Sequence, residues 1–290
     1  MTDPVSKDEE RRQLRARELP IVGACLTVPF IEQYRDWLFD SNRDVEVQGF
    51  TSARALDGDW RSVAEAAKRL LDGHAGRIGI HGPTTGFQIN SADPEIRAVI
   101  EKRMMQGLDV CAVLGGTHMV IHSAYTAWEQ HNFQNVKHWR QHFIDMTHLV
   151  LDRVIERASQ QGVVLVVENV ADIDPAERRL LVESFNSPSF RLSVDTGHAH
   201  FAHVTHGAPP ADCFIEDAGA LLEHVHLHDA DGYADRHWSV GRGSVAWHAV
   251  FGEIAEIAAL GHHPRIMLEL RYREEVPTSY TYLVEQGLVR

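Results

Sequence analysis

Short apolar runs alternate with longer amphipathic segments along almost the whole chain. Several of the short runs are continuous and rich in β-branched residues, which is typical of strands buried on both faces. We place the strands at residues 21–26, 44–47, 77–81, 117–122, 163–168, 190–195, 223–228 and 265–269. The amphipathic segments predict helices at residues 31–39, 60–71, 93–114, 133–161, 176–183, 213–222, 245–258 and 279–286. This alternation predicts a parallel sheet covered by helices.

About eight strand–helix units of this kind can close into a (β/α)₈ TIM barrel, an α/β fold that uses about 250 residues as one domain. The competing architecture is an open doubly wound sheet, but no Gly-x-Gly-x-x-Gly follows the first strand. We therefore predict a single barrel domain over residues 20–290, preceded by a charged N-terminal arm over residues 1–19.

Composition and charge narrow the choice of partners. The 290 residues include 28 Lys plus Arg against 41 Asp plus Glu, a formal net charge of −13. Such a chain repels a nucleic-acid backbone, so we expect no nucleic-acid partner. No run approaches the roughly 18 apolar residues that a membrane span needs, so we expect no membrane partner. The N-terminus lacks the apolar centre of a signal peptide, and Cys25, Cys111 and Cys213 are widely spaced and odd in number, which favours a reducing cytoplasm.

Polar residues that can bind metal end six successive apolar runs. They are His81, His122, Glu168, Asp195, one of the alternating His224, His226 and His228, and Glu269. Any one of them alone is more simply a structural histidine or an ion-paired carboxylate. All six together, however, would meet at the C-terminal end of a barrel, where such folds place their sites. Few Lys or Arg lie beside these positions to neutralise the carboxylates, so the pattern predicts a shared divalent cation.

Two further segments add ligands to this predicted site. His198 follows Asp195 by three residues, and we expect a loop to return it to the same pocket. The segment 229–243 carries Asp235 and His237 two residues apart and is punctuated by glycines. The alternative for this segment is a solvated turn in which Asp and Gly serve only turn geometry.

The motifs IHGPTTGFQINSADPEIR, VVENV, SVDTGHAHF, HVHLHDADGYADRHWSVGRGSVAW and MLEL make the chain similar to the xylose-isomerase-like TIM barrels, which include sugar phosphate isomerases/epimerases and endonuclease IV. The resemblance implies one metal held by Glu168, Asp195, His226 and Glu269, and it favours His226 over His228. The endonuclease IV branch implies further ions on His81 and His122 with Glu168, and on His198, Asp235 and His237. Two positions depart from the family patterns: Gly232 stands where 3-epimerases place an Arg, and His122-Ser123-Ala124 replaces the His-Pro-Gly of the endonucleases.

The function we expect is that of a metal-dependent sugar or sugar phosphate isomerase or epimerase. The metal (Mn, Zn, Co, Fe or Mg) would bind two adjacent substrate oxygens and stabilise an enediolate. Glu168 and Glu269 would move the proton off and onto carbon. His198, Arg236 and Trp238 would contact the substrate, a small sugar-derived molecule.

Two alternatives stay open from the sequence. The first is a multi-zinc phosphoesterase with up to three ions, supported by the complete set of additional ligands. The second is a non-catalytic barrel that only binds metal or a partner. Helical faces rich in Ala and Leu could bury a homo-oligomer contact.

Overall fold

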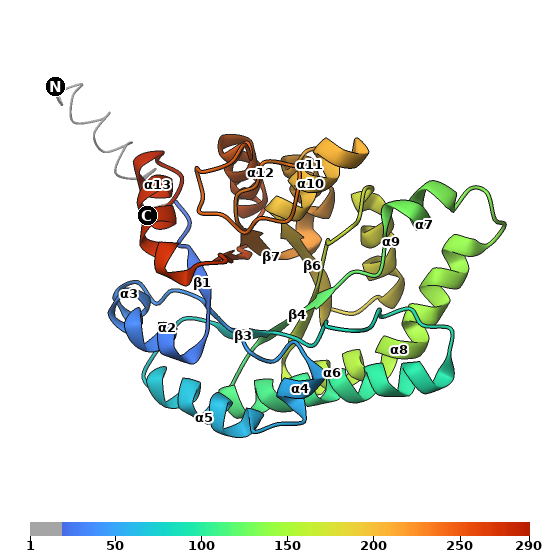
Figure 1. The fold of residues 1–290 in the computed structure, drawn as a ribbon, viewed down its shortest axis with the longest axis horizontal. Coiled ribbons are helices and arrows are strands. Elements are labelled where there is room, and N and C mark those ends of the chain that lie inside the picture. The colour runs from blue at the N-terminus through green and yellow to red at the C-terminus, as the bar shows by residue number, and fades with distance from the viewer. Residues whose placement is uncertain (1–18) are drawn as a thin grey trace.

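The computed structural model describes residues 19–290, so all but the last residue of the predicted arm lies outside the described residues. Eight parallel strands pair in chain order and β8 pairs back with β1, which closes a barrel (Figure 1). The strands are β1 (Gly23–Leu26), β2 (Val45–Val47), β3 (Ile78–His81), β4 (His118–His122), β5 (Val164–Glu168), β6 (Phe190–Asp195), β7 (Leu222–Leu227) and β8 (Arg265–Leu268). The prediction of a (β/α)₈ barrel is confirmed, and the open sheet is excluded.

Helices cover the outside of this barrel (Figure 1). They are α2 (Val28–Gln33), α3 (Arg35–Asp40), α4 (Ala53–Leu56), α5 (Trp60–Leu70), α6 (Pro94–Leu114), α7 (Ala127–Asn132), α8 (Trp139–Gln161), α9 (Pro175–Phe185), α10 (Thr196–His206), α11 (Ala211–Ala218), α12 (Trp247–Ala259) and α13 (Val276–Glu285), with 3₁₀ turns at Gly219–Leu221 and Arg273–Glu275. The helix predicted at residues 93–114 is confirmed as α6: Asp93 caps its N-terminus, Pro94 is in its first turn, and Gly115 ends it in a left-handed conformation. None of the helices within residues 19–290 combines the length and apolar character that a bilayer crossing requires.

Three predicted helices differ from the observed ones. The helix expected at 31–39 is two helices, because the backbone leaves the helical region at Tyr34 (φ −103°, ψ 17°). The long segment 133–161 is helical only from Trp139, since His138 has a left-handed backbone with φ of 66°. The helix expected at 213–222 ends at Ala218, because Gly219 adopts φ 49° and ψ −131°.

A fourth difference affects the site. We expected His198 on a loop, but it lies in the first turn of α10. Asp195 is the N-cap of this helix, and its Oδ1 accepts a hydrogen bond of 2.7 Å from the backbone N–H of His198. The spacing of three residues between the two is therefore that of a helix cap.

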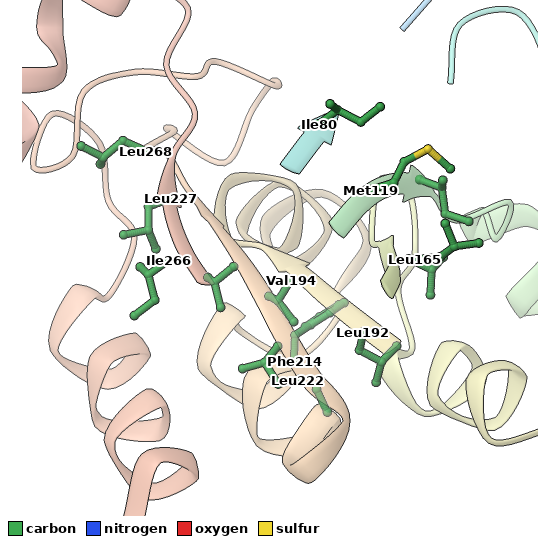
Figure 2. Close-up of a cluster of buried hydrophobic side chains, with 14 of the residues drawn as sticks. Ile80, Met119, Leu165, Leu192, Val194, Phe214, Leu222, Leu227, Ile266 and Leu268 are labelled. Atoms are coloured by element: carbon green, nitrogen blue, oxygen red, sulfur yellow. The ribbon is translucent and has the colours of Figure 1, made fainter. Parts of the chain in front are cut away.

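The apolar core lies between the strands and the surrounding helices. Figure 2 shows part of it, with side chains from β3 to β8 and Phe214 of α11. Leu165, Leu192 and Ile266 in this layer are at most 2% exposed. Each such side chain contributes about 1.5–3 kcal/mol through burial, so this layer supplies much of the stability of the barrel.

The inside of the barrel is unusually polar. TIM barrels usually fill their interior with layers of branched apolar side chains. Here Glu46, His118, Ser193 and His224 are all 0% exposed and contact one another across the interior. The stability of the barrel therefore comes mainly from the apolar layer between the strands and the helices, and polar side chains occupy the interior.

Candidate metal centre

Four predicted ligands meet at the C-terminal mouth of the barrel. Glu168, Asp195 and His226 lie at the C-terminal ends of β5, β6 and β7, and Glu269 directly follows β8. One potential ligand atom from each lies within 4.8 Å of the others. His226 Nδ1 is 2.6 Å from Glu168 Oε1 and 3.4 Å from Glu269 Oε2. These spacings suit groups arranged around one small cation. We refer to these four residues as the central cluster.

His81 and His122 extend the central cluster on one side. They end β3 and β4, and with Glu168 they form a second group of neighbouring donor atoms. His122 Nε2 lies 3.3 Å and His81 Nε2 3.9 Å from Glu168 Oε2. Glu168 thus faces the central cluster with one oxygen and this imidazole pair with the other.

A third group lies around Asp235 and adjoins the central cluster at Asp195. His237 Nε2 and His198 Nε2 are 3.0 and 3.5 Å from Asp235 Oδ1. His228 joins them, with its ring stacked on that of His237 at 3.9 Å between centroids and its Nε2 2.9 Å from Asp195 Oδ1. The structure therefore brings every predicted metal-ligating residue to one end of the barrel, in three adjoining groups.

The segment that carries Asp235 and His237 is anchored by Asp229. The carboxylate of Asp229 accepts hydrogen bonds of 2.9–3.1 Å from the backbone N–H groups of Ala230, Gly241 and Val245 and from the Trp247 indole. The backbone of Asp229 also pairs with Trp238 in both directions. Since these contacts secure both ends of the segment, it is more than a solvated turn.

Glu168 and Asp195 of the central cluster are ionised in spite of their burial. Burial alone would raise the pKa of Glu168, but the charge of His226, its hydrogen bond to Oε1 and the nearby imidazole of His122 hold this pKa well below its usual range. Burial opposes ionisation of Asp195 too, yet His198 and other imidazoles lower its pKa to about 2. Both groups are therefore negatively charged at neutral pH.

The sequence analysis missed Glu46 and the second contact of His226. Glu46 lies in the three-residue strand β2, and both of its oxygens are 3.2 Å from His226 Nε2. Burial alone would lower the pKa of His226, but Glu269 and Glu46, among other negative groups, raise it well above its usual value. The signal available in the sequence was the Val-Glu-Val pattern, which places Glu46 on the face opposite two apolar residues.

The donor set fits a divalent cation. Glu168 Oε2 and Asp195 Oδ2 are buried without a hydrogen-bond partner in the described structure. Ionised oxygens left unpaired in this way are costly unless a cation balances them. Carboxylate and imidazole ligands together suit Zn²⁺, Mn²⁺, Fe²⁺ and Co²⁺.

A cavity of about 400 Å³ opens beside these residues. Glu269, His81 and His122 line it together with four threonines, Gln48 and Arg273. Neither Arg236 nor Trp238, which we predicted as substrate contacts, is part of this lining. The Arg236 guanidinium binds the carboxylate of Asp231 at 2.9 Å and lies 5.3 Å from the Trp238 ring.

Two curated proteins are similar to parts of the chain. One is an uncharacterized protein of Methanocaldococcus jannaschii, 24% identical over 197 residues, which are 65% of this chain and 63% of that protein. The other is the 2-epi-5-epi-valiolone 7-phosphate 2-epimerase of an Actinoplanes species, 39% identical over 75 residues, or 26% of each chain. The chain therefore spans less than two thirds of the length of both relatives.

Solved structures share the fold over nearly the whole chain. The TTHB071 protein of Thermus thermophilus, soaked with ZnCl₂, has a TM-score of 0.68 and 24% identity and covers 92% of this chain and 97% of its own. A D-tagatose 3-epimerase-like protein has a TM-score of 0.66 and 20% identity, covering 85% and 91%. A family 2 AP endonuclease of Brucella melitensis has a TM-score of 0.65 and 15% identity, covering 92% and 99%.

The family model described as "xylose isomerase-like TIM barrel" matches residues 42–285. This match includes every residue of the three ligand groups and ends after the last strand of the barrel. The chain belongs to the xylose isomerase-like TIM barrel family.

Proposed function

We propose that this chain is a divalent-metal-dependent epimerase or isomerase of a small sugar, sugar phosphate or sugar-derived polyol. The metal ligands would be Glu168, Asp195, His226 and Glu269. The observation that carries the proposal is that Glu168 and Glu269 both approach Nδ1 of His226, so two carboxylates flank one cation position. The similarity of part of the chain to a 2-epi-5-epi-valiolone 7-phosphate 2-epimerase supports this class of reaction.

The two carboxylates would transfer the proton. Glu269 lines the cavity and is held by a hydrogen bond of 3.0 Å from Gln48 Nε2 to its Oε1. Glu168 is 1% exposed and would act from the opposite side of the reacting carbon. One would take the proton from carbon and the other would return one, which produces the change at that carbon. A bound divalent cation would stabilise the negative charge that develops on the neighbouring substrate oxygens.

His198 would orient a substrate oxygen. Its Nδ1 is held 2.9 Å from the backbone oxygen of Asn169, and it is therefore a donor at that nitrogen. The opposite nitrogen, Nε2, faces the segment that contains Asp235 at the mouth. Cations or substrate oxygens reaching this side would meet an imidazole with a fixed orientation.

The experiment is solvent exchange in heavy water. Candidate ketoses and their phosphates are incubated with the protein and each of Mn²⁺, Zn²⁺, Co²⁺, Fe²⁺ and Mg²⁺, and deuterium at carbon is followed by NMR. We expect Glu168→Gln and Glu269→Gln to lower exchange about 10²–10⁴-fold, while Glu65→Gln at an exposed position of α5 leaves it unchanged. Lack of exchange with every metal and sugar would count against the proposal.

The arrangement of three adjoining ligand groups favours one second candidate, a multi-zinc phosphoesterase. Glu168 is shared between two of the groups, as a bridging ligand would be. Metal analysis giving three ions per chain, together with hydrolysis of a phosphate monoester or of abasic-site DNA, would support it. One ion per chain would support the epimerase. Metal binding with neither activity would indicate a non-catalytic barrel.

A further inference from the structure

Glu46 is a buried carboxylate that the proposed chemistry does not use. It lies in β2, below the central cluster, and is 0% exposed. Within the described chain, its charge partners closer than 4.0 Å are all imidazoles, those of His118, His224 and His226. The carboxylate is therefore surrounded by groups that can each donate a single N–H while neutral.

The distances show how this cluster is organised. His226 Nε2 is 3.2 Å from both oxygens of Glu46, His224 Nε2 is 3.2 Å from Oε2, and His118 Nε2 is 3.8 Å from Oε2. The other nitrogen of His224 lies 2.9 Å from Ser193 Oγ. Because the serine hydroxyl can donate to that nitrogen, the proton of His224 is free to face Glu46.

The backbone also makes room for this arrangement. A Cβ atom on Gly79 of β3 would lie 2.1–2.2 Å from three atoms of the His118 ring. Only glycine lets this imidazole occupy its place inside the barrel. The cluster thus depends on residues from β2, β3, β4, β6 and β7.

Stability does not account for this cluster. A buried carboxylate without a cation partner is costly, and well-packed apolar groups of similar volume are often as stable or more stable. The Glu46 contact that connects to the mouth is the one with His226, whose opposite nitrogen faces Glu168 and Glu269. We therefore expect Glu46 to influence the site through its contact with His226.

We propose that Glu46 is a positioning residue that binds the Nε2–H of His226 and so presents an unprotonated Nδ1 to the metal. A neutral imidazole carries one proton, and only the nitrogen without it can ligate a cation. In the metal-free site the charged His226 also donates from Nδ1 to Glu168 Oε1, 2.6 Å away, and a bound cation would replace that proton. Glu46 provides the second acceptor, which favours the tautomer that binds metal. This inference rests on the metal role proposed above for His226.

The test compares metal affinity and histidine tautomer in the full-length protein. Zn²⁺ affinity is measured by competition with a chromophoric chelator for wild type, Glu46→Gln and Glu46→Ala. We expect about tenfold weaker binding for Glu46→Gln, which keeps an acceptor oxygen, and about 100-fold for Glu46→Ala. Glu177→Gln is the matched control, because Glu177 is also buried but pairs with Arg140 on the outside of the barrel. It is expected to lower stability and leave zinc affinity unchanged.

Long-range ¹H–¹⁵N spectra of zinc-loaded protein give the second readout. We expect His226 as the Nε2–H tautomer in wild type and loss of that pattern in Glu46→Ala. Unchanged affinity and tautomer in both Glu46 variants, with tight binding by wild type, would overturn the positioning role alone. A wild type that binds no divalent metal would overturn the proposed function as well. A second zinc that is lost in Glu46→Ala and His118→Ala but kept in His226→Ala would show that Glu46 is itself a ligand and overturn the proposal.

Discussion

Gly79→Ala tests whether the polar interior is packed as tightly as the distances indicate. The new Cβ would lie 2.1 Å from His118 Cε1, while ordinary contacts are 3.4–4 Å, so the ring must retreat by about 1.3 Å. His118 is 0% exposed and lies beside Glu46 and His224, so we expect a shift of its ring to disturb these neighbours. Overpacking of this kind costs about 1–3 kcal/mol, and we expect Gly79→Ala to destabilise the fold by that amount.

The double variant Gly79→Ala/His118→Ala separates the clash from other effects. His118→Ala removes a buried ring whose two nitrogens lack hydrogen-bond partners in the described structure, and it leaves a hole beside residue 79. The alanine methyl group then enters that hole instead of striking the ring. The double variant is therefore expected to lose at least about 1 kcal/mol less than the sum of the single losses.

Urea unfolding followed by circular dichroism measures these free energies. Gly252→Ala is the matched control, because a Cβ there meets nothing within 4 Å and the position is exposed in α12. We expect it to stabilise the protein by about 0.5–1 kcal/mol, since alanine favours a helix over glycine. Losses that add within about 0.3–0.5 kcal/mol in the double variant would refute the reasoning.

Three further outcomes are expected. Burial lowers the pKa of His118 to about 3, so between pH 6.5 and pH 3 the unfolded chain binds a proton that the native state does not, and the free energy of unfolding decreases as the pH is lowered. In urea unfolding, His118→Ala should therefore reduce the decrease in this free energy between pH 7 and pH 5 by about 2 kcal/mol. The same decrease in the variant as in wild type would contradict this prediction. Asp229→Ala removes the acceptor of four hydrogen bonds, so it should lower the free energy of unfolding by about 2–4 kcal/mol and make residues 230–244 susceptible to limited proteolysis. Resistance of this segment to proteolysis in the variant would show that other contacts hold it. Zinc at 100 times its dissociation constant should stabilise the protein by about 2.7 kcal/mol, and a melting temperature that neither zinc nor EDTA alters would contradict a native metal site.

The barrel could be predicted from the sequence because its strands and helices have different hydrophobic periods. Runs such as Val164–Glu168 are continuous and apolar up to a polar terminal residue, and in the structure this residue, Glu168, belongs to the central cluster. The ends of α6 were readable for the same local reason, since Asp93 and Gly115 act within one turn of the helix. The break at His138 was not readable, because a left-handed backbone at a non-glycine residue leaves no hydrophobic signature.

The candidate site could likewise be predicted only in part. Residues at strand ends could be grouped, since a barrel brings all C-terminal strand ends together. The partner of each histidine at residues 224, 226 and 228 could not be predicted, because their alternation places all three on one face of the predicted strand and the sequence offers each several acceptors. The structure gives them different neighbours: His224 contacts Ser193, His226 contacts Glu168, and His228 contacts Asp195.

The interior position of Glu46 could not be predicted from the sequence for a different physical reason. In most half-buried strands the polar residue between two apolar ones faces water, and a glutamate in a three-residue strand suggests nothing more. In a closed barrel the helices cover the outer face, so alternation sends the apolar Val45 and Val47 outward and the carboxylate into the interior. A polar residue in the middle of a barrel strand is therefore a better indicator of interior chemistry than of solvent exposure, and Glu46 is where that rule bears on the metal ligand His226.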